Sequence, residues 1–110
     1  MFLNYLIDID GTICEDIKNE DSHLYPMAKV IVGAIESLHR KIQEGHTITY
    51  FTSREEKDRQ ATLTWLQNNG FPEAKLIMDK PRRTQTHVEY RVIDNQKFSS
   101  ILFDGNWEGI

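Results

Sequence analysis

Residues 3–12, Leu-Asn-Tyr-Leu-Ile-Asp-Ile-Asp-Gly-Thr, decide the fold. Residues 3–9 are a short, mainly apolar run with little alternation, which is typical of a strand buried on both faces of a parallel sheet. Asp8 and Asp10 lie at the end of this run, and Gly11 follows them, where the lack of a Cβ lets the backbone turn. The segment therefore predicts a buried strand that brings two carboxylates to one edge of a sheet.

A helix is predicted after this strand and the polar loop that follows it. Apolar residues recur with the helical period from Met27 to Ile42, so they form one stripe along a helix. Pro26 suits the first turn of such a helix, and Gly45 suits its end. The first strand is therefore expected to lead, through a loop, into one amphipathic helix.

A second strand and helix come next. Residues 46–52 are β-branched and aromatic, which favours a strand. Ser53 and Glu56 match a capping box, in which Ser53 caps a helix and Glu56 reaches back to it. This helix is expected to carry Trp65 inward and to end at Asn69 and Gly70.

Three further strands are predicted, over residues 75–78, 89–93 and 98–103. Only about seven residues separate Lys80 from the fourth strand, so no full crossover helix fits there. The alternation of strands and helices predicts a three-layer α/β/α Rossmann-like sandwich with a mostly parallel five-stranded sheet. A length of 110 residues, 39% of them hydrophobic, suits a single domain over residues 1–110.

Composition and charge exclude several function classes. The formal net charge of -4 argues against a nucleic-acid partner, because counterion release needs clustered positive charge. The apolar start of the chain has no basic leader and runs straight into Asp8, which argues against a signal peptide or a membrane span. Cys14 is the only cysteine, so no internal disulfide forms. We expect a cytoplasmic protein without a membrane partner.

The residues predicted at the carboxyl ends of the strands are polar, and the ligand crevice of an open α/β sheet lies at those ends. Asp8 and Asp10 would point the same way on an extended backbone, and two close anions need a cation or a proton between them. Mg²⁺ is the natural cation, because it binds carboxylates, waters and a substrate phosphate. Asp94, at the end of the fourth strand, is the expected third ligand beside Asp8 and Asp10.

Phosphate-binding groups are predicted around these carboxylates. Thr52 would lie just ahead of a helix N-terminus, where a hydroxyl and free backbone amides favour a phosphate, and Lys80 would add a positive charge. Asp8 would then be the nucleophile that forms an aspartyl-phosphate, and Asp10 the general acid and base. We also expect substrate contacts from three residues at the same edge: Thr12, Ser53 and Arg54. Together these residues predict a phosphoryl-transfer site.

The chain resembles the haloacid dehalogenase-like (HAD) superfamily over nearly its whole length. Residues 8–12, Asp-Ile-Asp-Gly-Thr, match the first motif of that superfamily, and the later motifs look like Thr52, Lys80 and Asp94, in the same order. The resemblance implies a HAD-like fold and the roles given above, with a metal held by the Asp8 side chain, the Asp10 backbone carbonyl and Asp94. Asn95 departs from the second aspartate that the fourth motif often carries.

The chain is most similar, within that superfamily, to small phosphatases found with capsule and surface-polysaccharide genes. The Thr-Ser-Arg after the second strand and the short Lys-Pro connection carry this resemblance, which implies a sugar phosphate as the small phosphorylated substrate. A cap domain has no room, because residues 13–26 form at most a flap. The site is therefore expected to be open, or covered by a neighbouring subunit of a homo-oligomer. Trp107 is expected to pack at the sheet edge or at such a subunit contact.

Three alternatives stay open. The same site could act on a macromolecule, either a phosphoprotein or a nucleic-acid end, since a capless site admits large partners. A receiver-like phosphoacceptor domain also uses an Asp, a Thr or Ser and a Lys around Mg²⁺, but it would hold its phosphate. A binding domain whose catalysis has decayed is the third alternative, and Asn95 is the only hint of it.

Overall fold

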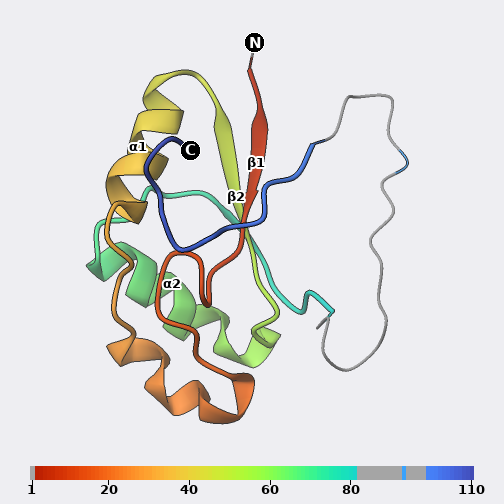
Figure 1. Cartoon of the computed structure of the whole chain (residues 1–110). Helices are drawn as coiled ribbons and strands as arrows, with labels where there is room; N and C mark the ends of the chain where they lie inside the picture. The colour runs from red at the N-terminus through yellow and green to blue at the C-terminus, as the bar shows by residue number, and fades with distance from the viewer. Residues whose placement is uncertain (1, 82–92, 94–98) are drawn as a thin grey trace.

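The computed structural model describes residues 2–81, 93 and 99–110 of the chain. Its centre is a three-stranded sheet in the order β1-β2-β3, made of β1 (Asn4–Ile7), β2 (Thr47–Phe51) and β3 (Lys75–Ile77) (Figure 1). Both pairings are parallel, with Tyr5 opposite Ile48 and Tyr50 opposite Leu76. The first three predicted strands are thus confirmed, each slightly shorter than expected.

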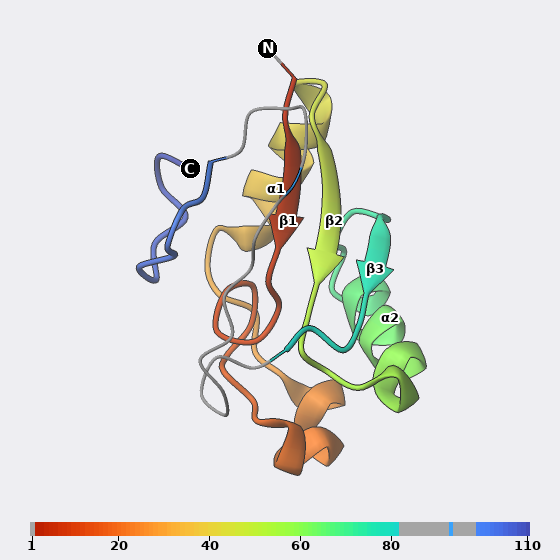
Figure 2. The ribbon, with the colours of Figure 1, turned by 90° about the vertical axis from the view of Figure 1, so that its right-hand side faces the viewer.

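The helices lie on one face of this sheet. Both α1 (Ala34–Gln43) and α2 (Arg59–Asn68) lie on the left of the sheet in Figure 1, and in Figure 2, turned by 90°, α1 lies behind β1. Two 3₁₀ segments, η1 (Asn19–Met27) and η2 (Glu56–Asp58), precede them. The steps from β1 to β2 and from β2 to β3 run in the same direction, so right-handed crossovers place both helices on one face.

The described residues therefore form two layers instead of the predicted three. The predicted fourth strand lies outside the described residues except for Ile93, and residues 99–103 of the predicted fifth strand are not in a strand. A mostly parallel Rossmann-like arrangement is present, but a five-stranded sheet is not shown.

The core lies between the sheet and the helices. Tyr5, Ile7 and Tyr50 face the helices, and Ile7 and Tyr50 are buried, whereas Leu6 on the opposite face is 57% exposed. Because side chains alternate along a strand, the two faces of β1 differ in this way. The expectation that β1 is buried on both faces is therefore wrong for the part of the chain that the structure describes.

Residues 28–33, just before α1, are not helical, although their apolar spacing predicted a helix. Gly33 has a φ of 89°, a left-handed conformation that favours glycine, and α1 begins only at Ala34. Two backbone bonds tie the preceding residues to the loop after β1: Glu15 N–H donates to the Lys29 carbonyl and Ile31 N–H donates to the Ile13 carbonyl. These bonds, and the β-branched run before Gly33, outweigh the helical pattern.

The second helix begins later than the sequence predicted. Its N-cap is Asp58, and neither η2 nor α2 has a side-chain cap bond, so the expected capping box at Ser53 is wrong. Glu56 instead binds the Arg59 side chain one turn on. The helix ends before Asn69 and Gly70 as predicted. No helix in the described part of the chain has the length and apolar character needed to cross a bilayer.

Candidate active site

Asp8 lies just after β1, with its side chain 42% exposed. Lys80 Nζ is 3.1 Å from its Oδ1, and the Thr12 hydroxyl donates a long hydrogen bond of 3.5 Å to its Oδ2. The structure thus brings Lys80, which lies far along the chain, next to Asp8 and Thr12. A partly exposed carboxylate beside a lysine is suited to attack a phosphorus atom while the lysine neutralises the phosphoryl oxygens.

Lys80 is held at this edge by backbone bonds beyond the ends of β2 and β3. Its N–H donates to the Thr52 carbonyl at 2.9 Å, and the Asp79 N–H donates to the Arg54 carbonyl at 2.8 Å. Asp79 has a φ of 64°, a left-handed conformation that aspartate tolerates better than most residues. The Lys80 ammonium lies 5.5 Å from the centre of the Phe51 ring. The backbone and this ring therefore direct the lysine toward Asp8.

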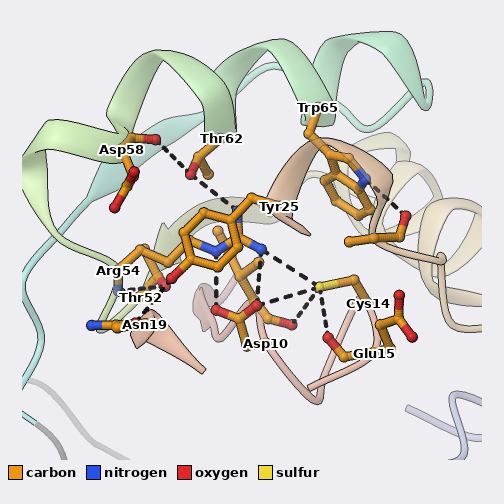
Figure 3. Close-up of polar contacts among 12 residues, drawn as sticks. Asp10, Cys14, Glu15, Asn19, Tyr25, Thr52, Arg54, Asp58, Thr62 and Trp65 are labelled. Atoms are coloured by element: carbon orange, nitrogen blue, oxygen red, sulfur yellow. Dashed lines mark hydrogen bonds and ion pairs between the residues drawn. The ribbon is translucent and has the colours of Figure 1, made fainter. Parts of the chain in front are cut away.

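Asp10 is held by Arg54, a residue that is completely buried (Figure 3). Arg54 Nε lies 3.0 Å from Asp10 Oδ2, and Nη2 lies 2.8 Å from Oδ1, so the pair is bidentate. The third nitrogen, Nη1, donates to the Thr62 hydroxyl on α2 at 3.1 Å. The Tyr25 ring from η1 stacks 3.7 Å from the guanidinium carbon. Three elements therefore fix the arginine that holds Asp10.

The charge state of Arg54 follows from these contacts. Burial by itself would lower its pKa, but the hydrogen bonds and the charge of Asp10 outweigh burial, and the pKa is raised above its ordinary value. A charged guanidinium that is buried and paired in this way destabilises the fold if its partner is removed. Direct contact between Arg54 and a substrate, which the sequence suggested, is not what the structure shows, because the side chain is enclosed and turned toward Asp10.

Thr52 and Ser53 support the loop after β2. The Thr52 hydroxyl is fully buried and accepts the Arg54 N–H at 3.1 Å. The Ser53 carbonyl accepts a hydrogen bond from the Asn19 side-chain amide at 2.9 Å, and Asn19 in turn accepts one from the Tyr25 hydroxyl. The predicted placement of Thr52 at a helix N-terminus is wrong, because α2 begins only at Arg59.

Sequence reasoning missed the neighbours of the Asp10–Arg54 pair. The Cys14 thiol, fully buried, lies 3.7 Å from Asp10 Oδ1 and 3.8 Å from Arg54 Nη2. Burial, then the charge of Asp10, raises the pKa of Cys14 to about 12, so the thiol is neutral. Tyr25 and Thr62 carried no sequence signal, because their roles depend on how η1 and α2 pack around Arg54.

The described part of the site meets the needs of Mg²⁺ only in part. Asp8 offers a partly exposed carboxylate, the hard oxygen ligand that Mg²⁺ prefers. No group of three His, Cys, Asp or Glu side chains in the described ranges is arranged to hold a metal. The predicted ligand Asp94 and its neighbour Asn95 lie outside the described residues. Asp8 and the Asp10 carbonyl are therefore the two candidate ligands that the structure describes.

Comparison with known proteins decides the family. Residues 5–99 match the family model described as PITM 1-3, LNS2 domain. The chain belongs to the LNS2 domain family. LNS2 domains have a HAD-like phosphatase fold, so the superfamily expected from residues 8–12 is supported. The family is not the capsule-phosphatase type, so the resemblance to that subgroup, which rested on two short peptides, is corrected.

One curated relative of this LNS2-family chain comes from Oceanobacillus iheyensis and is named "Putative nucleotidase OB0422". The two are 31% identical over 87 residues, which are 79% of this chain and 38% of the relative. The chain thus spans well under half of that protein. No solved structure gives a significant match.

Proposed function

We propose that the chain is a Mg²⁺-dependent HAD-type phosphohydrolase that acts on a small phosphomonoester through an aspartyl-phosphate on Asp8. The observation that carries this proposal is the partly exposed Asp8 carboxylate set between Lys80 and Thr12, with Asp10 two residues further on. A sugar phosphate and a nucleoside monophosphate are the two substrate classes to compare. The name of the Oceanobacillus relative supports nucleoside monophosphates, and sugar phosphates, which only the corrected subgroup resemblance implied, are the class for comparison.

The first half of the reaction forms the covalent intermediate. An Asp8 carboxylate oxygen attacks the phosphorus, and the bond from phosphorus to the leaving-group oxygen breaks. Asp10 enters this step in its protonated form, gives that proton to the leaving-group oxygen and becomes the carboxylate that pairs with Arg54. Lys80, 3.1 Å from Asp8, neutralises charge on the phosphoryl oxygens, and Thr12 keeps the nucleophile oriented.

The second half releases inorganic phosphate. A water molecule attacks the phosphorus of the aspartyl-phosphate, Asp10 takes the proton of the water, and the acyl-phosphate bond breaks to restore Asp8. Both Asp10 oxygens accept from Arg54, but each carboxylate oxygen keeps a second lone pair for this transfer. Mg²⁺, bound by Asp8, the Asp10 carbonyl and Asp94, would supply charge neutralisation of the transferring phosphoryl group. Arg54 acts through Asp10, as a positioning residue.

The test is phosphate release from an aryl phosphate, a set of sugar phosphates and a set of nucleoside monophosphates, with and without Mg²⁺. Wild type runs beside Asp8→Asn, whose amide cannot serve as the nucleophile. Glu36→Gln is the matched control, because it removes one carboxylate charge from an exposed position on α1. We expect turnover in wild type and Glu36→Gln, only with Mg²⁺, and none in Asp8→Asn. Turnover that survives in Asp8→Asn would exclude the covalent mechanism.

A further inference from the structure

The C-terminal segment, residues 103–110, packs against the loop that follows β1. Trp107 is only 5% exposed, and its indole N–H donates to the Thr12 carbonyl at 2.9 Å. In the ribbon the segment ends beside α1 (Figure 1). A residue 95 positions away in the sequence thus binds the backbone of the motif that carries Asp8.

Thr12 is held on both of its sides. Its carbonyl accepts from Trp107, and its hydroxyl donates to Asp8 Oδ2. The Thr12 and Ile13 N–H groups both bind the Ile9 carbonyl at 3.0 Å, which closes the turn. A movement of the Thr12 backbone would therefore also move the hydroxyl that contacts the nucleophile.

The indole itself is fixed by its surroundings. A Cβ on Gly33 would come within 3.2 Å of the Trp107 Cβ, so the two backbones approach closely there. The Phe103 ring packs against the indole, with the ring centres 5.2 Å apart. Beyond Trp107, the Lys41 ammonium donates to the Ile110 carbonyl at 2.7 Å. These contacts hold the N–H in line with Thr12.

We propose that Trp107 is a positioning residue for the nucleophile, acting through the Thr12 carbonyl. The proposal rests on the proposed function, because it concerns the reactivity of Asp8. The indole N–H restrains the loop in which Asp8 and Thr12 face each other. A small loss of that alignment slows the chemical step steeply and leaves ground-state binding almost unchanged.

The chain offers a matched control in Trp65. This second tryptophan is 3% exposed, and its indole N–H also donates to a backbone carbonyl, that of Ala28, at 3.0 Å. Trp107→Phe and Trp65→Phe therefore make the same chemical change in two buried places, and of the two indoles only that of Trp107 donates a hydrogen bond to the loop after β1. Trp107→benzothienylalanine keeps the shape of the indole and lacks the N–H, so it covers the case in which Trp107→Phe fails to fold.

The measurements are kcat and KM with Mg²⁺ and the best substrate, and the hydrogen exchange of the Thr12 and Ile13 amides in the full chain. We expect both Trp107 variants to lower kcat by roughly tenfold with KM within about twofold, and to speed exchange at both amides. Trp65→Phe should leave kcat and this exchange near the wild-type values. Equal effects of the two Phe substitutions, or unchanged exchange in the Trp107 variants, would overturn the proposal.

The hydrogen-exchange measurement also distinguishes a failure of the Trp107 proposal from a failure of the proposed function. A wild-type protein that releases no phosphate from any substrate would refute the proposed function and, with it, the role of Trp107 in the reaction. Faster exchange in that case would still show that Trp107 restrains the loop.

Discussion

Arg54 and Asp10 form a bidentate ion pair in which the guanidinium is fully buried and the carboxylate side chain is 12% exposed. The two residues come from the ends of neighbouring strands and are 44 positions apart in the sequence. Removing one partner of such a pair leaves an uncompensated charge in the interior, whereas replacing both partners by apolar residues is often neutral. This asymmetry yields the first prediction.

Arg54→Met should lower the free energy of unfolding by about 3–5 kcal/mol, because it leaves Asp10 without its partner. The double variant Asp10→Leu with Arg54→Met should recover most of that loss and remain inactive. Urea denaturation of both variants, with phosphate release measured alongside, checks both statements. If the double variant is no more stable than Arg54→Met, the pair is not the source of the effect.

Lys80→Met should reduce kcat by about a hundredfold or more while changing the free energy of unfolding by less than about 1 kcal/mol. The Lys80–Asp8 contact is partly exposed, so its contribution to stability is small. The main role of Lys80 is to neutralise the charge on the phosphoryl oxygens in the transition state. The matched control is Lys57→Met, which breaks the exposed Lys57–Glu55 pair. Kinetics and thermal melting are the two measurements. A Lys80→Met enzyme with wild-type kcat would remove Lys80 from the mechanism.

The stability of the fold should fall at alkaline pH because of Cys14. Its pKa is raised to about 12 in the folded state, mainly by burial, so the folded protein keeps the thiol proton after the unfolded chain has lost it. This contribution is fully present below pH 9 and is lost as the pH rises toward 12. Between pH 7 and about 10.5 the resulting loss in the free energy of unfolding is at most about 2 kcal/mol.

Urea denaturation at these two pH values, for wild type and Cys14→Ala, measures that contribution. Tyr50, whose pKa burial also raises, adds to the loss in both proteins, so the difference between them isolates Cys14. An equal loss in the two proteins would show that the thiol takes no part.

Removal of divalent metal should abolish turnover and leave the fold intact. The metal is expected to neutralise charge in the transition state, whereas the described core is held by apolar packing and hydrogen bonds. EDTA treatment followed by Mg²⁺ addition should switch activity off and on with little change in the melting temperature. Isothermal titration should show Mg²⁺ binding that weakens in Asp8→Asn. Absence of binding at millimolar Mg²⁺ would favour a binding domain whose catalysis has decayed.

The first three strands and the carboxylate motif were predictable from sequence because their signals are local. Residues 8–12 form a contiguous motif, and β2 is marked by its β-branched and aromatic residues. The start of α1 was not predictable, because the bond between Ile31 and Ile13 competes with a helical pattern that the sequence also contains. The start of α2 was missed because Glu56 binds Arg59 instead of reaching back.

In the candidate site, too, some features were predictable from sequence and others depended on tertiary contacts. Asp8, Lys80 and Thr12 were predictable as neighbours, because parallel strands end at a common edge. The burial of Arg54 was not predictable, since it depends on the Tyr25 ring, the Thr62 hydroxyl and the Asp10 carboxylate arriving from three separate elements. Asp94 and the fourth strand lie outside the described residues, so those expectations stay predictions.

The position of Arg54 also has a consequence for sequence divergence. Its N–H binds Thr52, its carbonyl accepts from Asp79, and its guanidinium holds Asp10, so one residue connects the segments that follow all three strands. A lineage that loses either Asp10 or Arg54 keeps an uncompensated charge in its core, and selection for stability would then favour loss of the second residue. Among relatives with this sheet, the two positions should therefore covary, and a pair of apolar residues there would mark a descendant that has kept the scaffold and abandoned the chemistry.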